Sequence, residues 1–210
     1  MATDSHLRRH SDLTMENERL REELACVRAQ LRSLLRQATT DELTGLLNRR
    51  GFQRLAVEEM RRAQSRLRTL TLIYVDVDGL KALNDRAGHE AGDALLVETA
   101  ALLRTAFRAG DVVARLGGDE FAVLTRGFHG DTEVIRRRID QVGEALRRSG
   151  VQTQSISLST GVVLVNPGME SDLDEWLARA DHAMYAQKRR KYAAARAANR
   201  PRPAPLSVAV

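Results

Sequence analysis

The segment Arg115–Phe121 places two glycines directly before two adjacent carboxylates, Asp119 and Glu120, between apolar stretches. Glycine has no Cβ, so the backbone here can turn tightly and approach a ligand closely. Neighbouring carboxylates at such a turn can face one site, and Mg²⁺ prefers carboxylate oxygens, usually alongside substrate phosphates. The same residues also fit a surface hairpin whose acids are simply solvated. The rest of the chain must decide between a metal site and a plain turn.

A second acidic pair, Asp76 and Asp78, ends the apolar run Leu70–Val77, which has the composition of a strand. Because side chains alternate along a strand, both carboxylates lie on one face. If this strand pairs beside the glycine turn, Asp76 meets Asp119 and Glu120, and converging carboxylates repel unless a cation neutralises them. Acids holding Mg²⁺ on adjacent strands are typical of nucleotidyl transfer. The alternative is that these acids only cap strand ends.

Polar residues suited to a nucleotide follow this predicted strand. Lys81 can offset phosphate charge, while Asn84 and Asp93 offer the donors and acceptors that recognise a purine edge. A carboxylate at Asp93 accepts from both N1–H and the 2-amino group of guanine, and adenine lacks that pair of donors. His89 alone means little, since capping or buried histidines are common.

Composition narrows the possible classes. The 210 residues are 43% hydrophobic but only 4% aromatic, so aliphatic side chains must fill the core. The single cysteine, Cys26, excludes an intrachain disulfide framework and suits a reducing compartment. No apolar run reaches the ~20 residues of a membrane helix, so we expect a cytoplasmic protein. The net charge of +5 leaves nucleic-acid binding open, but the excess is arginine-rich with few interleaved aromatics, which a small anionic ligand explains equally well.

The N-terminal part predicts a coiled coil. Residues 1–12 have no apolar period and are expected to be disordered, whereas residues 13–38 follow a heptad pattern. Its a positions are Asn17, Leu24, Leu31 and Ala38, and its d positions are Leu13, Leu20, Val27 and Leu34. An asparagine at a heptad a position typically favours a parallel, in-register dimer. The alternative is an amphipathic helix that packs on its own domain.

Residues 39–192 predict one α/β domain in which helices and strands interleave around a central hairpin. We expect helices at 48–66, 91–107, 132–148 and 173–190, and strands at 70–77, 112–115, 121–125 and 156–165. The economical fold is a mixed or antiparallel sheet covered by helices. Residues 193–210 carry three prolines and are expected to be a disordered tail.

Several motifs in order resemble the GGDEF domain of diguanylate cyclases over about residues 39–190. They are Asp41–Arg50, Asp76–Asp85, Gly88-His89, Gly92-Asp93, Arg115–Phe121, Ser159–Gly161 and Ala180–Tyr185 followed by Lys188. The resemblance implies a central five-stranded sheet surrounded by helices, similar to nucleotide cyclases and the polymerase palm. It also implies the condensation of two GTP into cyclic di-GMP with release of two pyrophosphates, across a homodimer.

The resemblance also implies roles for individual residues. Mg²⁺, or Mn²⁺ in its place, would be bound by Asp76, the Val77 carbonyl and Asp119, with Glu120 beside the metals. Asp119 would help to deprotonate the attacking 3′-hydroxyl. The other implied contacts are Lys81 and Lys188 to phosphates, Asn84 and Asp93 to guanine, His89 nearby, and Leu46 lining the base pocket.

An inhibitory site is implied as well. Arg108 and Asp111 match the family's Arg-x-x-Asp site, which binds the product cyclic di-GMP away from the active site, and Arg136–Arg138 could supply a second arginine. A guanidinium suits phosphate or guanine acceptors, and a carboxylate suits guanine donors. By itself, Arg-x-x-Asp is a frequent chance match.

The chain departs from the family after Lys188. The usual glycine turn and phosphate-binding arginine are absent there, which leaves Arg189, Arg190 or Lys191 as substitutes; Leu80 also replaces the usual phenylalanine. Two other functions remain open beside the cyclase: a catalytically silent receptor for cyclic di-GMP, and a dimerisation module with a vestigial nucleotide site. The intact acids of the glycine turn favour the enzyme.

Overall fold

The computed structural model describes residues 2–150, 156–166, 168 and 172–198. The chain divides into two compact units, residues 1–40 and 41–210, and each is described by itself. Within the described residues, no helix combines the length and apolarity needed to cross a membrane.

The first unit is a single helix, α1 (Ala2–Thr39). It begins at Ala2, so residues 2–12 are helical and the predicted disorder of residues 1–12 is wrong for them. Leucine and valine side chains of the predicted heptad are about half exposed, at 48–62%: Leu20, Leu24, Val27, Leu31 and Leu34. Within this single chain the apolar seam is thus open to solvent.

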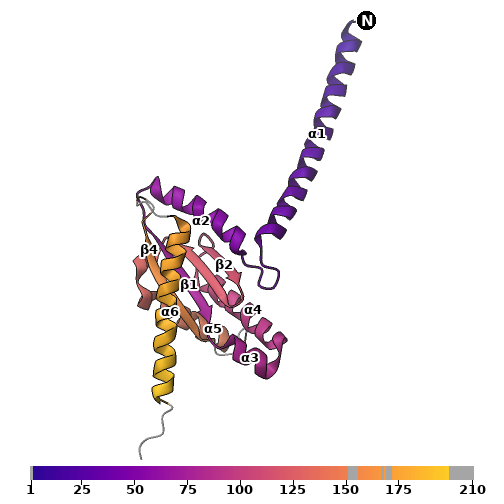
Figure 1. Ribbon diagram of the computed structural model, residues 1–210. Helices are drawn as coiled ribbons and strands as arrows, with labels where there is room; N and C mark the ends of the chain where they lie inside the picture. The colour runs from indigo at the N-terminus through magenta and orange to yellow at the C-terminus, as the bar shows by residue number, and fades with distance from the viewer. Residues whose placement is uncertain (1, 151–155, 167, 169–171, 199–210) are drawn as a thin grey trace, which may run out of the picture. The chain divides into compact units, whose positions relative to one another are not determined.

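The second unit is a four-stranded sheet with helices on both faces (Figure 1). Its strands are β1 (Leu70–Val77), β2 (Val112–Gly117), β3 (Glu120–Thr125) and β4 (Leu158–Val165). Its helices are α2 (Arg49–Gln64), α3 (Leu80–Ala87), α4 (His89–Ala106), the short 3₁₀ helix η1 (Phe128–Gly130), α5 (Thr132–Arg148) and α6 (Leu173–Ala198). The strand order is β2-β3-β1-β4, and every pairing is antiparallel.

The α/β fold class is confirmed, but the described sheet has four strands rather than the five implied. The segment before α2 contributes one parallel bridge, between Leu47 and Ala114, and no continuous ladder. Here Arg115 N donates to Leu47 O at 2.8 Å. This segment therefore lies against the β2 edge without forming a further strand.

Alternation along the buried strands creates two apolar layers. Leu72 and Tyr74 of β1 face one layer, formed with α2 and α6, whereas Ile73 and Val75 face the other, formed with α4 and α5. All eight residues of β1 are buried, as expected for a central strand covered on both faces. The central strand ends in Asp76 and Val77, so the packing that buries β1 also fixes the position of these residues.

Two further segments differ from the sequence prediction. Helix α3 was missed, because Asp78-Gly79 and the polar residues after it read as a loop. Helix α6 continues through Lys188 to Ala198, since no glycine or proline interrupts residues 188–198. The predicted disorder of 193–210 is therefore wrong for residues 193–198, and residues 199–210 lie outside the described part.

Candidate active site

The glycine turn between β2 and β3 is braced by an arginine. The backbone φ angles of Gly117 and Gly118 are +149° and +52°, values that residues with a Cβ rarely adopt. Arg115 donates to Gly118 O from Nε at 3.0 Å and from Nη2 at 2.8 Å. Its Nη1 reaches Asp41 Oδ1 at 3.2 Å. The turn that carries Asp119 is consequently fixed from within.

The turn meets the end of β1, as the sequence predicted. Val77 N donates to Asp119 O at 3.0 Å, and Asp76 is the direct ladder partner of Glu120. Asp119 interacts electrostatically with Asp76, and this repulsion contributes to a raised pKa of the Asp76 carboxyl. Asp76 and Asp119 thus lie close together where β1 and the turn meet.

Lys188 of α6 neutralises Asp76. Its Nζ lies 2.6 Å from Asp76 Oδ1, and the Asp76 side chain is only 9% exposed. Burial is the largest cause of the raised pKa of Asp76, and the Lys188 hydrogen bond opposes it. The pKa of Lys188 is raised as well: burial would lower it, but the hydrogen bond to Asp76 and the charges of Asp76 and Asp119 outweigh that effect. The site concentrates negative charge that a cation must balance.

Glu120 has different partners. Its carboxylate lies 3.7 Å from Arg49 Nη2, and Arg49 Nε also donates to Leu116 O at 3.3 Å. Burial, followed by the charge of Glu120 and a hydrogen bond with it, raises the pKa of Tyr74. Glu120 is thereby drawn along the sheet toward α2.

The joint binding of one metal site by Asp76, Asp119 and Glu120 stays a prediction. Across the described residues, no three or more His, Cys, Asp or Glu side chains are grouped to hold a metal ion. The physical reason is that Lys188 balances Asp76 and Arg49 attracts Glu120. The donor set still fits a hard divalent cation, because the Asp76 carboxylate already holds the Lys188 ammonium group, and Asp119 lies nearby on the turn.

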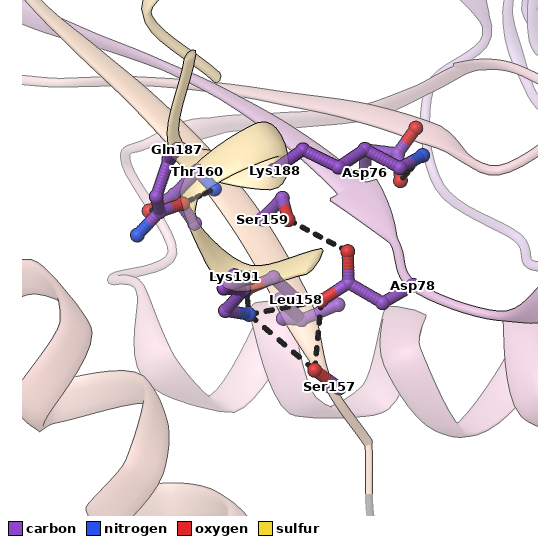
Figure 2. A network of polar contacts seen from close by, with 9 residues as sticks. All are labelled: Asp76, Asp78, Ser157, Leu158, Ser159, Thr160, Gln187, Lys188 and Lys191. Atoms are coloured by element: carbon purple, nitrogen blue, oxygen red, sulfur yellow. Dashed lines mark hydrogen bonds and ion pairs between the residues drawn. The ribbon is translucent and has the colours of Figure 1, made fainter. Parts of the chain in front are cut away.

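Asp78 belongs to a second polar network, which includes Lys191, one turn after Lys188 on α6 (Figure 2). Its Oδ1 accepts from Ser159 Oγ at 2.6 Å, and its Oδ2 accepts from Ser157 Oγ at 2.7 Å and Lys191 Nζ at 2.9 Å. Burial opposes ionisation of Asp78, but these hydrogen bonds outweigh it and lower its pKa. Lys191 is thus occupied at Asp78, whereas Arg189 and Arg190 are exposed.

The predicted base-recognition residues gather where α3 meets α4. Asn84 of α3 lies against Gly92 of α4, where an added Cβ would be 1.9 Å from Asn84 Oδ1. That oxygen is buried and has no hydrogen-bond partner among the described residues. Asp93 follows Gly92 and is exposed. The absence of a side chain at Gly92 therefore creates the space that Asn84 occupies.

The other predicted residues lie as follows. Lys81 of α3 and His89, the first residue of α4, are both exposed. Leu46 is 4% exposed and belongs to the apolar layer on the α4 side of the sheet. Its contact with a base stays a prediction, which its burial does not favour.

Arg108 and Asp111 form a tight turn after α4. Arg108 N donates to Asp111 Oδ2 at 2.9 Å, and Asp111 N donates back to Arg108 O at 2.9 Å. Both line a cavity of about 340 Å³ together with Arg126 and Arg138. Arg138 is the member of the Arg136–Arg138 run that reaches this cavity, where its Nε donates to Ala106 O.

A family model described as "Diguanylate cyclase, GGDEF domain" matches residues 38–193. The chain belongs to this family. Among curated relatives of the GGDEF domain, diguanylate cyclase TpbB of Pseudomonas aeruginosa is 39% identical over 160 residues, and probable diguanylate cyclase DgcC of Escherichia coli is 34% identical over 159. Each alignment covers 75% of this chain but only 37% and 43% of the relative, so the chain spans less than half of either.

Solved GGDEF structures share the fold. One is the coiled coil and GGDEF domain of DgcB from Caulobacter crescentus in complex with c-di-GMP. It matches with a TM-score of 0.63 and 30% identity, over 86% of this chain and 93% of that one.

Some residues of this GGDEF domain site were missed from the sequence. Arg49 lies within the Asp41–Arg50 motif, but the sequence indicated no role for it, because its ion pair with Glu120 depends on how α2 crosses the sheet. No pattern in the sequence indicated a role for Ser157 or Gln187. Their contacts join β4 to α6, and no local spacing predicts such a pairing.

Proposed function

We propose that this GGDEF domain is a diguanylate cyclase that condenses two GTP into cyclic di-GMP and two pyrophosphates. The observation that carries the proposal is the pair Asp76 and Asp119 at the junction of β1 and the glycine turn, balanced by Lys188. In each half-reaction, a 3′-hydroxyl oxygen bonds to the α-phosphorus of the other GTP. The bond from that phosphorus to the β-phosphate bridging oxygen breaks, and pyrophosphate leaves.

Asp76, the Val77 carbonyl and Asp119 are the groups that would hold Mg²⁺, with Glu120 beside them. When bound, the divalent cation would polarise the α-phosphate and stabilise its developing charge. Asp119 accepts the 3′-hydroxyl proton in our proposal, since it lies on the turn at the edge of the site. Lys188 moves from Asp76 to the triphosphate, which brings its own negative charge.

Guanine recognition is supported by the unpartnered oxygen of Asn84. A buried acceptor without a hydrogen bond is costly, so a ligand donor there would be favoured. Asp93 adds a carboxylate that accepts two donors from guanine, whereas adenine offers no such pair. His89 lies at the start of the same helix. We therefore propose selectivity for GTP over ATP, with Lys81 offsetting charge on the phosphates.

Two copies are required, because one domain holds one GTP. We propose that α1 supplies a parallel coiled coil, on the basis of its exposed heptad seam. The double variant Leu24→Asp, Leu31→Asp should be monomeric by sedimentation, and its activity at micromolar concentration should fall about tenfold or more, because the second site loses its high effective concentration. The control Leu67→Asp changes a 97% exposed leucine outside α1 and should change neither property. A monomeric variant with full activity would contradict the dimer.

Product inhibition is supported by the cavity at Arg108. Its arginines suit the two phosphates of cyclic di-GMP, and Asp111 suits guanine donors. The solved DgcB domain is described in complex with the same molecule. A silent receptor for cyclic di-GMP is the second candidate, favoured only by this cavity. Because the substrate is GTP, we place the activity in the cytoplasm.

The experiment that tests the proposal is incubation of the dimer with GTP and Mg²⁺, followed by chromatographic separation of products. We expect cyclic di-GMP and pyrophosphate in a 1:2 ratio, no product with ATP, and none after chelation of the metal. Binding of cyclic di-GMP without any synthesis would instead establish the receptor.

A further inference from the structure

Lysine is rare in this chain, and two of its lysines stand three residues apart on α6. Of the 33 lysine and arginine residues, only Lys81, Lys188 and Lys191 are lysines. Lys188 binds Asp76 near the end of β1, and Lys191 binds Asp78 directly after this strand. A lysine ammonium is a compact charge with three rotatable donors, whereas a guanidinium is a rigid planar fork. Where the chain otherwise uses arginine, these positions use the smaller group.

Lys191 uses all three donors. Its Nζ donates to Asp78 Oδ2 at 2.9 Å, to Ser157 Oγ at 3.3 Å and to Leu158 O (Figure 2). The side chain is 39% exposed, yet each donor of the ammonium has an acceptor. Lys191 therefore joins α6 both to the end of β1 and to the start of β4.

This contact completes a series along α6. At Gly161, an added Cβ would lie 1.9 Å from Ala180 O, so helix and strand backbones are in close contact there. Further along the helix, Gln187 accepts hydrogen bonds from Thr160, and Lys191 then reaches Leu158. Lys188 projects from the same turn that Gln187 and Lys191 attach to the strand. Both ends of the Lys188 turn are thus fastened to β4.

We propose that Lys191 is a positioning residue, which fixes the turn of α6 that presents Lys188 to Asp76 and to the triphosphate of GTP. It takes the place of the family's glycine turn: instead of ending, the helix continues and is clamped to Asp78. Lys191 acts through Lys188 and does not itself touch the nucleotide. The inference rests on the proposed GTP site.

A double-mutant cycle tests the positioning role of Lys191. The measured quantity is the dissociation constant of a non-hydrolysable GTP analogue, determined by calorimetry in the presence of Mg²⁺. We expect Lys191→Met to weaken binding about five- to tenfold in the otherwise native chain, but by less than about twofold when Lys188→Met is already present, because a residue that acts through another loses its effect with it. A merely structural role would give additive losses. The control Arg196→Met, at an exposed position later on α6, should leave the dissociation constant unchanged.

Additive effects, or no effect of Lys191→Met while Lys188→Met weakens binding, would overturn the inference and leave the proposed site intact. If Lys188→Met also leaves binding unchanged, or if the native chain does not bind the analogue, the proposed GTP site itself fails. Should Lys191→Met not fold, judged by its melting curve, the same cycle is run with Lys191→Gln.

Discussion

Lys188 Nζ lies 2.6 Å from Asp76 Oδ1, at the point where the central strand meets the glycine turn. This ion pair sits where metal and triphosphate are expected to meet. Asp76 is nearly buried and close to Asp119, so its charge is costly without a cation. Lys188 supplies that charge in the nucleotide-free chain, and an incoming metal must displace it.

The first prediction follows from this competition. Lys188→Met should bind Mn²⁺ about three- to tenfold more tightly than the native chain in the absence of nucleotide, because the competing ammonium of a partly buried pair is gone. Electron paramagnetic resonance titration at pH 8 measures free Mn²⁺ directly. Arg196→Met is the charge-matched control and should leave the affinity unchanged. Weaker Mn²⁺ binding by Lys188→Met would show that the lysine supports the metal site instead of opposing it.

Gly92→Ala should damage nucleotide binding and spare the fold. The new Cβ would lie 1.9 Å from Asn84 Oδ1, the end of a side chain that can rotate away. We expect the KM for GTP to rise about tenfold, since one specific hydrogen bond to the base is lost. Gly92→Ala and Asn84→Ala should have similar effects, and their combination should add little. The control Ala94→Ser, at an exposed position on α4, should keep the native KM; a native KM for Gly92→Ala would contradict the assignment of Asn84.

Arg108→Ala should relieve product inhibition while leaving the initial rate unchanged. Arg108 lines the cavity with Asp111 and Arg138, and neither Asp119 nor Glu120 is among the residues that line it. Losing a charge-assisted contact to phosphate should raise the inhibition constant for cyclic di-GMP about tenfold or more. The measurement is the initial rate at increasing concentrations of added product. An unchanged inhibition curve for Arg108→Ala would reject this site.

The pH dependence of the free energy of unfolding should reveal the stabilising contribution of the Glu59 carboxylate. Burial opposes its ionisation, but hydrogen bonds from Arg126 and Arg62 outweigh this effect and lower its pKa below the usual value of a glutamate. A lowered carboxyl pKa stabilises the fold above the pKa of the unfolded chain, and this contribution is lost as the pH falls through the folded pKa. Glu59→Gln should therefore be less stable than the native chain at pH 6, by about 1 kcal/mol because both arginines are half exposed.

This difference should shrink as the pH falls from 6 toward 3 and native Glu59 becomes protonated through its lowered pKa. Urea unfolding at both pH values measures it. Glu58→Gln, next to Glu59 but half-exposed, is the control and should show little difference at either pH. A constant gap for Glu59→Gln between pH 6 and pH 3 would contradict the lowered pKa.

Much of the site could be predicted because its residues are close in sequence to strand ends. Asp76 ends a strand with a clear apolar pattern, and Asp119 follows two glycines that only a turn explains, so their meeting required one correct strand pairing. The partners of these acids could not be predicted in the same way. Lys188 reaches Asp76, and Arg49 reaches Glu120, only because α6 and α2 cross the same face of the sheet. The helix was predicted to end at residue 190, because the prolines at 201–205 indicated a disordered tail, although no helix breaker stands in residues 188–198.

The most direct test of the central claim compares the native dimer with Asp119→Asn for the conversion of GTP into cyclic di-GMP. The substitution keeps the size of the side chain but removes the charge that is proposed to bind the metal and accept the 3′-hydroxyl proton. We predict that turnover falls by about a thousandfold or more, with the melting temperature unchanged within about 2 °C because Asp119 lies on a turn and is only partly buried. Synthesis of cyclic di-GMP by Asp119→Asn at the native rate would contradict the account.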